Sequence, residues 1–273
     1  EIYKDSSYKV KEGEEFILNL LISNNIINEP ENIPLEIIFE DEDIYIINKK
    51  AGIVTHPAPG HYNGTLVNAL MFHSNNNLSN INNSRPGIVH RLDKETSGIM
   101  VVAKNNESHN ILAKQFKDHL ISRKYKAIVW GIPHNQKIEG YIQRHRINRK
   151  EMALNNHNKG KYSATKIKLK KTYDIASLVE CTLSTGRTHQ IRLHMASINS
   201  PVIGDKVYGK YKFKKYEKNK DTFNKYLILK NFKRHALHAF HLGFNHPKSN
   251  KYIEFNNDLP EDMSNLLNLI VKY

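Results

Sequence analysis

Residues 85–104 read RPGIVHRLDKETSGIMVVAK, and the rest of the chain is interpreted around this stretch. It opens on Pro86-Gly87, a dipeptide typical of a turn. Close to its end it carries a run of five apolar residues, the length of a buried strand. Asp93 lies between the two, flanked by Arg91 and Lys94. Nearby cations favour the ionised form of a carboxylate, so Asp93 is a candidate nucleophile or electrostatic stabiliser rather than a general acid. The alternative interpretation is a surface aspartate in a weak ion pair.

The composition favours a polyanionic partner and a reducing compartment. The chain has 273 residues, with 41 Lys and Arg against 27 Asp and Glu, which gives a formal charge of +14. Such a surplus suits nucleic acid or an anionic membrane surface. No apolar run approaches 18 residues, so we expect no membrane span. The one cysteine, Cys181, excludes an internal disulfide and lies in an alternating run typical of a buried strand, so we expect a core residue and a cytoplasmic protein.

Two motifs carry a resemblance to a known family. His90-Arg91-Leu92-Asp93-Lys94, followed by Thr96-Ser97-Gly98, resembles the active-site motif of the RluA/RluD family of RNA pseudouridine synthases. Residues 186–195, GRTHQIRLHM, are similar to the second strong motif of that family. Further similar segments follow one another in the family's order from residue 34 to the C-terminus. Lys50 stands where the family usually has proline, which predicts a looser turn there.

The resemblance implies three catalytic residues. Asp93 is the nucleophile, whether by attack at C1′ of the ribose or by a related elimination path, and Arg192 is its partner. Tyr125 matches the active-site tyrosine, which stacks on the base and can help to remove the C5 proton. Taken alone, Tyr125 also fits a half-buried tyrosine in a strand over residues 123–130.

The resemblance also suggests RNA contacts. Arg91 is the residue expected to fill the gap left by a flipped base. The other candidates are His90, Arg187 and His189, together with Arg144 and Arg149 from residues 140–153, where the family usually has a longer hairpin. The same basic residues also fit a solvated face without RNA.

The implied reaction is isomerisation of uridine to pseudouridine within RNA. No electrons or groups are exchanged with a second substrate, so no cofactor and no metal is expected. His56 and His61 are the residues closest to a ligand pattern, but no cysteine or acidic group completes a site.

The motif details resemble the RluD branch most, which implies large-subunit ribosomal RNA, or a pre-ribosomal particle, as partner and the helix 69 loop as target. The alternatives are a relative acting on other ribosomal or transfer RNA sites, and a catalytically idle RNA-binding or ribosome-assembly protein. A carboxylate glycosidase is a weaker alternative, because it would need two acid/base carboxylates and Asp93 alone is singled out.

Dispersed strands with a few helices predict an α+β fold. The resemblance adds the pseudouridine synthase fold, a mixed, mostly antiparallel central sheet with flanking helices and a basic RNA-binding cleft. Residues 1–34 are similar to the tail of an S4-type RNA-binding domain and its linker, and residues 35–273 form the catalytic domain. We expect exposed loops over residues 75–84 and 210–233, and a monomer.

Overall fold

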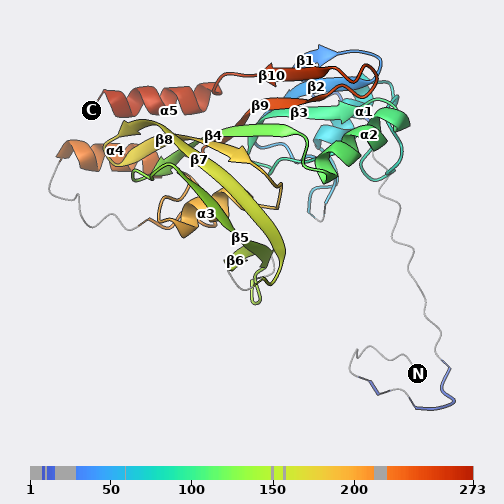
Figure 1. Ribbon diagram of the computed structural model, residues 1–273, viewed down its shortest axis with the longest axis horizontal. Helices are drawn as coiled ribbons and strands as arrows, with labels where there is room; N and C mark the ends of the chain where they lie inside the picture. Colours follow the sequence, from blue (N-terminus) through green and yellow to red (C-terminus); the bar gives the residue numbers. More distant parts are fainter. Residues whose placement is uncertain are drawn as a thin grey trace.

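The computed structural model describes residues 8–9, 11–15, 29–58, 60–148, 151–155, 158–211 and 220–272. A ten-stranded sheet with the order β1-β2-β3-β9-β4-β8-β7-β5-β6 organises them, and β10 adds to β9 (Figure 1). The strands are β1 (Ile37–Glu40), β2 (Ile44–Lys49), β3 (Ser97–Ala103), β4 (Ser122–Trp130), β5 (Gln136–Arg144), β6 (Met152–Asn155), β7 (Lys161–Tyr173), β8 (Ala176–Leu183), β9 (Leu237–Asn245) and β10 (Tyr252–Asn256). The helices are α1 (Leu66–His73), α2 (Asn106–Lys117), α3 (Gln190–Ser197), α4 (Lys220–Lys230) and α5 (Glu261–Val271). The predicted α+β class with a mostly antiparallel sheet is confirmed.

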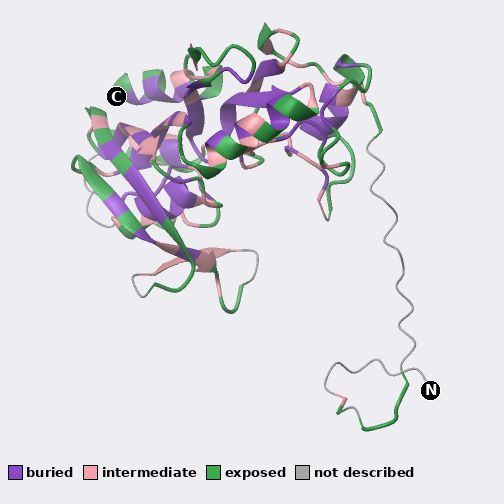
Figure 2. Cartoon of the chain, turned by 45° about the vertical axis from the view of Figure 1, so that its right-hand side comes forward, coloured by how far each residue is buried: buried purple, intermediate pink, exposed green. Residues whose placement is uncertain are grey.

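Strands β2 and β3 are buried on both faces, which explains their nearly continuous apolar sequences. Ile46 belongs to a core cluster with Leu112 of α2. Its neighbour Ile47 points to the opposite face and joins a second cluster with Leu70 of α1. Successive strand residues face opposite sides, so the two helices cover the two faces of this part of the sheet. Figure 2 shows the buried residues concentrated in the strands and in the helix sides that face them.

The two parts of the sheet meet at one short parallel contact. Ser97 and Gly98 of β3 pair with His238 and Ala239 of β9, while every other pairing within the sheet is antiparallel across the described strands. Gly98 has a φ of +125°, and a Cβ on it would overlap the backbone of Ala239. Only glycine allows the two strands to approach this closely. Asp93 lies four residues before this junction, so the contact helps to place the loop that carries it.

Strand β4 lies at the centre of the sheet, because it pairs with β8 on one edge and β9 on the other. Tyr125 lies opposite Cys181 of β8 and Ala239 of β9. Cys181 is fully buried, which confirms its predicted core position. Burial also raises the pKa of its thiol to about 12, so the thiol stays protonated.

Two predicted loops are wrong in part. Residues 220–230 form helix α4, in which Leu229 is fully buried and which packs against α5. The lysines among its apolar residues make the helical spacing hard to recognise, which is why a loop was predicted. In the expected loop at residues 75–84, Leu78 and Ser79 are buried, and Ser79 N–H donates to Ala103 O at 3.3 Å.

Residues 29–33 are tied to the start of the catalytic domain. Asn68 Nδ2 donates to Glu29 O at 2.7 Å, and Glu31 N–H donates to Asn68 O at 3.0 Å. Asn68 also forms a capping box with Thr65 at the start of α1. The division into an S4-like tail up to residue 34 and a catalytic domain from residue 35 stays a prediction. Among the described residues, no helix is long and apolar enough to cross a membrane.

Candidate active site

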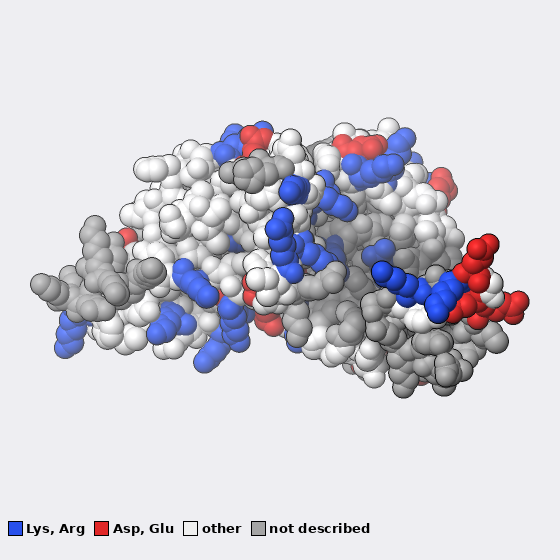
Figure 3. All heavy atoms as spheres, turned by 90° about the horizontal axis from the view of Figure 1, so that it is seen from below, with Lys and Arg blue, Asp and Glu red and all other residues white. Residues whose placement is uncertain are grey.

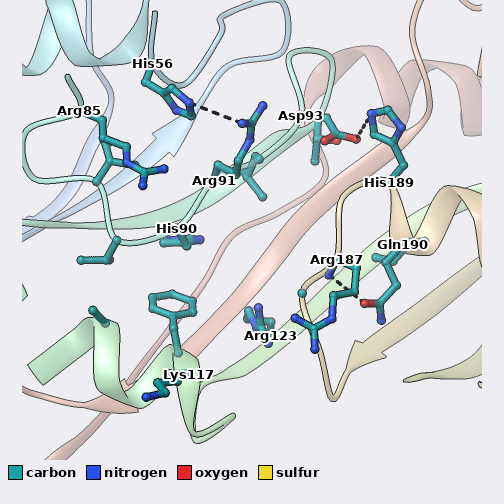
Figure 4. Close-up of a pocket in the computed structure, with 18 of the residues that line it drawn as sticks. His56, Arg85, His90, Arg91, Asp93, Lys117, Arg123, Arg187, His189 and Gln190 are labelled. Atoms are coloured by element: carbon teal, nitrogen blue, oxygen red, sulfur yellow. Dashed lines mark hydrogen bonds and ion pairs between the residues drawn. The ribbon is translucent and has the colours of Figure 1, made fainter. Parts of the chain in front are cut away.

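A cleft of about 810 Å³ brings the two sequence motifs together. Its walls come from the loop before β3, helix α2, strand β4 and the turn that leads into α3. Figure 3 shows a face of the molecule on which many Lys and Arg side chains are exposed. Figure 4 shows basic side chains in separate parts of the cleft, and Asp93 beside His189. A basic cleft with one carboxylate inside it is suited to a polyanionic substrate.

The loop that carries Asp93 is held by its own carbonyl groups. Thr55 Oγ1 donates to Leu92 O at 3.0 Å, and Gly52 N–H donates to Lys94 O at 2.8 Å. The Lys49 ammonium is buried at the end of β2 and donates to Lys94 O at 3.1 Å as well as to two carbonyls of its own loop. Burial lowers the pKa of Lys49 to about 7, although Asp93 opposes this shift. The carboxylate is therefore placed by backbone contacts on either side of it.

Arg192 is the ion-pair partner of Asp93. Its Nη1 lies 3.1 Å from Asp93 Oδ2. Its other two nitrogens bind Asp205, with Nε at 2.7 Å from Oδ2 and Nη2 at 2.9 Å from Oδ1. Burial alone would lower the pKa of Arg192, but the bonds to Asp205 and the charge of Asp93 raise it above its usual value. Arg192 is therefore a fixed cation that faces the Asp93 carboxylate.

Asp205 is a site residue that the sequence analysis did not single out. It is buried, and its Oδ1 also accepts from the backbone N–H groups of Val207 and Tyr208 at 2.9 and 3.1 Å. The bonds to Arg192 and to these backbone groups lower its pKa, although burial opposes them. It lies in Gly204-Asp205-Lys206-Val207-Tyr208-Gly209, one of the further segments that are similar to the family, but the sequence does not show which cation it binds.

His189 is the residue before helix α3 rather than part of it, with a left-handed φ of 57°. Its Nε2 lies 3.8 Å from Asp93 Oδ2, and its Nδ1 lies 2.8 Å from the Tyr208 hydroxyl. That hydroxyl also accepts from Met152 N–H at 2.9 Å, so it links His189 to strand β6. Burial lowers the pKa of His189, so the ring is neutral at pH 7.

The turn into α3 is fixed by Gln190. Its Oε1 accepts from Thr185 Oγ1 at 2.7 Å and from Arg187 N–H at 3.0 Å. Its Nε2 donates to Ala164 O at 3.0 Å. Gln190 thus fastens the second motif to strand β7, so that Arg187 and His189 stand on opposite sides of it (Figure 4).

Tyr125 lines the same cleft from strand β4 and is 9% exposed. Burial raises the pKa of its phenol, Arg123 opposes that shift and Asp93 adds to it. The ring is therefore neutral at pH 7 and presents an apolar surface close to the carboxylate. This geometry suits stacking on a planar base.

The cations next to Asp93 in sequence point away from it. Arg91 is exposed, and its Nη1 lies 3.5 Å from His56 Nε2 (Figure 4). Lys94 Nζ lies 3.5 Å from His61 Nε2. The prediction that neighbours in sequence surround Asp93 with positive charge is therefore wrong in detail, because the contacting cation is Arg192, from a distant segment.

The other predicted RNA contacts occupy different places. His90 lines the cleft, but its Nε2 accepts from Val101 N–H at 3.1 Å and its ring stacks on Phe116 with centroids 4.5 Å apart, so it also serves the fold. Burial lowers the pKa of His90 to about 3. Arg187 lines both the cleft and a smaller hollow of about 430 Å³, which Arg144 shares. Arg149 lies outside the described residues.

One group of described side chains has the composition of a metal site, namely Asp41, Asp43 and His246. Its atoms are used by the fold. His246 Nε2 lies 2.8 Å from Asp41 Oδ2, and Asp43 Oδ1 accepts from Asn105 and Ser108. The group is at the β1–β2 turn and does not line the cleft.

Comparisons with known proteins agree with this geometry. Residues 43–197 match the family model described as RNA pseudouridylate synthase. The chain is 44% identical over 272 residues to the ribosomal large subunit pseudouridine synthase D of Zymomonas mobilis, covering 99% of this chain and 83% of that protein. It is 41% identical over 261 residues to the protein of the same name from Buchnera aphidicola, covering 95% and 81%.

A solved structure shows the same fold. The human RNA pseudouridylate synthase domain containing 4 superposes with a TM-score of 0.64 at 21% identity, over 86% of this chain and 93% of that one. The family model covers more than half of the chain, and it includes both motifs that line the cleft. The chain therefore belongs to the RNA pseudouridylate synthase family and is an RNA pseudouridine synthase.

Proposed function

We propose that this enzyme converts uridine to pseudouridine in large-subunit ribosomal RNA, at the helix 69 loop, with Asp93 as the nucleophile. The observation that carries the nucleophile assignment is the Asp93–Arg192 ion pair inside a basic cleft. The names of the relatives from Zymomonas mobilis and Buchnera aphidicola support the choice of ribosomal RNA. The helix 69 target rests on the resemblance to the RluD branch.

The reaction begins with extrusion of the uridine from its stack, which costs a few kcal/mol. Arg91 is exposed at the mouth of the cleft, where its guanidinium can occupy the space left by the base. Asp93 then acts at the sugar, either on C1′ or through elimination, and the N1–C1′ bond breaks. The base turns while it is held, and C5 bonds to C1′. The C5 proton leaves and N1 gains one, so no electrons are exchanged and the chemistry requires no redox cofactor.

Arg192 and Tyr125 have distinct roles in this proposal. Arg192 orients the Asp93 carboxylate, since it is itself anchored by Asp205. Tyr125 holds the detached base by stacking. Burial raises the pKa of its phenol, so the hydroxyl stays protonated and no phenolate is present to remove the C5 proton, which favours stacking. We further propose that the enzyme works as a monomer in the cytoplasm, where it meets ribosomal RNA or a pre-ribosomal particle.

The test is pseudouridine mapping in large-subunit RNA that lacks the modification, after incubation with the wild type and with Asp93→Asn. The expected result is pseudouridine in the helix 69 loop with the wild type alone, while both proteins bind the RNA equally. Asp118→Asn, an exposed change at the end of α2, is the matched control and should be as active as the wild type.

Each other result corrects a particular part of the proposal. Modification at another ribosomal site, or in transfer RNA alone, would keep the chemistry and reject the target. Full activity of Asp93→Asn would reject the nucleophile. Binding without modification of any RNA would leave an idle RNA-binding protein on this fold.

A further inference from the structure

Arg123 is a buried cleft residue to which the proposed chemistry gives no role. It is 8% exposed, and its Nε has no hydrogen-bond partner in the described part of the chain. It makes no ion pair with any carboxylate in the same part. Its guanidinium lies over the ring of Phe116, 5.6 Å from the centroid. A guanidinium stays charged in proteins, and a buried charge without a counter-ion is costly, so this position is suited to a bound anion.

Gly186 makes the space that the Arg123 guanidinium occupies. A Cβ on Gly186 would overlap Arg123 Nη1. Gly186 is not among the glycines with a left-handed backbone, so its conformation does not demand glycine. The absence of a side chain therefore serves to admit the guanidinium against the turn of the second motif.

A second guanidinium stands at the same end of the cleft. Arg187 is fixed because its Nε donates to Tyr162 O at 2.9 Å. Figure 4 shows Arg123 and Arg187 together, away from the end where His56 and Arg91 meet. Burial lowers the pKa of Arg123, and the charge of Arg187 lowers it further. Two like charges held together repel each other, and an anion between them converts that repulsion into attraction.

The spacing of Arg123 and Tyr125 along β4 fits one nucleotide. Arg123 and Tyr125 are two residues apart on β4, so their side chains leave the same face of the sheet about 6.6 Å apart. Both line the cleft that contains Asp93. An RNA strand whose uridine lies between Tyr125 and Asp93 therefore brings one of its own phosphates close to Arg123.

We propose that Arg123 and Arg187 form a phosphate-binding subsite that holds the phosphodiester next to the flipped uridine. It rests on the proposed function in one respect, that the ligand is RNA. The subsite would fix the register of the strand, while Asp93 and Tyr125 receive the base. Backbone contacts of this kind position a nucleic acid without reading its sequence.

Arg123→Met tests the subsite, because methionine keeps the apolar stem and removes the charge. The unliganded variant should melt at the same temperature as the wild type or higher, since an uncompensated buried charge is removed. Its affinity for a helix 69 stem-loop should fall about 30-fold, typical of a lost charged hydrogen bond. The slope of log affinity against log salt should become shallower by about 0.7. Binding is measured in an Asp93→Asn background, where no turnover occurs.

Two further variants separate charge from geometry. Gly186→Ala keeps both arginines but displaces the guanidinium, and it should weaken RNA binding by a smaller factor. Lys168→Gln removes an exposed charge on β7 outside the cleft, and it should not alter the response to a neutral phosphate. A structural role for Arg123 predicts the opposite stability result, a clear fall in melting temperature for Arg123→Met.

Neutral methylphosphonate linkages on either side of the uridine identify the phosphate. In the protein that keeps Arg123, one such linkage should lower the RNA affinity about as much as Arg123→Met does. Arg123→Met should show no further loss of affinity for the RNA with that linkage. Additive effects at every linkage would overturn the proposal and leave the base or another protein group as the partner of Arg123. Absence of pseudouridine with this coupling intact would reject the proposed function and keep the subsite. Normal activity of Arg123→Met with an unchanged salt slope would reject the subsite and keep the proposed function.

Discussion

Arg192 binds two aspartates at once, but it is anchored by only one of them. Two of its nitrogens lie 2.7 and 2.9 Å from Asp205, while a single nitrogen lies 3.1 Å from Asp93. A bidentate pair fixes the plane of a guanidinium, whereas a single bond leaves it free to rotate. The orientation of Arg192 is therefore set by Asp205. The position of the Arg192 guanidinium therefore does not depend on its contact with Asp93.

Asp205→Asn should consequently impair catalysis without altering any residue that touches the RNA. We expect kcat to fall about 100-fold with little change in KM, because a misplaced charge costs roughly this much. The loss of a buried ion-pair partner should also lower the free energy of unfolding by about 3 kcal/mol. Single-turnover kinetics and urea unfolding measure the two effects. Equal losses in kcat and in RNA affinity would instead place Asp205 in the binding surface.

At the contact between β3 and β9, a methyl group added to Gly98 should have a large effect on the free energy of unfolding. Gly98→Ala should lower the free energy of unfolding by about 3 kcal/mol or more, because φ is +125° and the new Cβ meets the backbone of Ala239. Urea unfolding measures this change. Gly52→Ala is a useful control, since its φ is also left-handed but nothing lies within 4 Å of a Cβ there. Equal effects of the two substitutions would show that backbone strain, rather than close packing of β3 on β9, is responsible.

Tyr125→Phe separates the ring of Tyr125 from its hydroxyl. Phenylalanine keeps the stacking surface, so the fold and the affinity for RNA should be unchanged. Because Tyr125 is proposed to act by stacking, the rate of pseudouridine formation should also stay close to that of the wild type. A hydroxyl that helped to remove the C5 proton would instead leave isomerised base that still carries this proton. Quenched-flow analysis of the bound RNA detects it. A wild-type rate would remove the hydroxyl from the reaction and leave Tyr125 as a stacking platform alone.

Arg91→Ala tests whether an exposed arginine stabilises the flipped state. The variant should lose about 30-fold in activity on a uridine that is stacked in a stem-loop, equivalent to about 2 kcal/mol of extrusion energy. The loss should be much smaller on a short single-stranded RNA, whose uridine is already unstacked. A comparison of kcat/KM on the two substrates gives the answer. The same loss on both would assign Arg91 to general electrostatic attraction.

Much of this structure follows from local pattern. The strands β3, β4 and β8 lie where the apolar run after Asp93, the strand over residues 123–130 and the alternating run around Cys181 predict them. The spacing of Leu112, Phe116 and Leu120 predicts a helix as far as Leu120, but α2 ends at Lys117 and Leu120 is 64% exposed. Strand β7 was missed because its lysine-rich sequence resembles a solvated face, although Ser163, Ala164, Thr165 and Ile167 are buried.

The site was predicted less completely, because its chemistry depends on pairings across long stretches of chain. The motifs identify Asp93 and Arg192, but only the fold shows that Asp205 orients Arg192. Arg123 offers no signal in sequence, since an arginine at the start of a strand is usually exposed. Its guanidinium lies against Gly186, far along the chain, where a Cβ would overlap Nη1.

Buried histidines give the protein a predictable sensitivity to acid. His194 is fully buried, and burial lowers its pKa from 6.5 to about 4. Its Nδ1 lies 2.9 Å from Thr165 Oγ1, which already accepts from Gln190 Nε2, so the threonine hydroxyl donates to the ring. Its Nε2 lies 3.0 Å from Ser163 Oγ and carries the ring proton. Protonation of Nδ1 would therefore break a hydrogen bond inside the core.

The sign of the pH effect follows from proton binding. The unfolded chain protonates His194 near pH 6.5 and the folded chain near pH 4, so the unfolded state binds more protons in this interval. The contribution of neutral His194 to the free energy of unfolding is present above pH 6.5 and falls by about 3 kcal/mol as the pH drops to 4. Urea unfolding at several pH values should show a shallower dependence for His194→Gln than for the wild type. Replacement of the exposed His134 should leave the dependence as it is in the wild type, and an unchanged dependence in His194→Gln would show that the other buried histidines dominate.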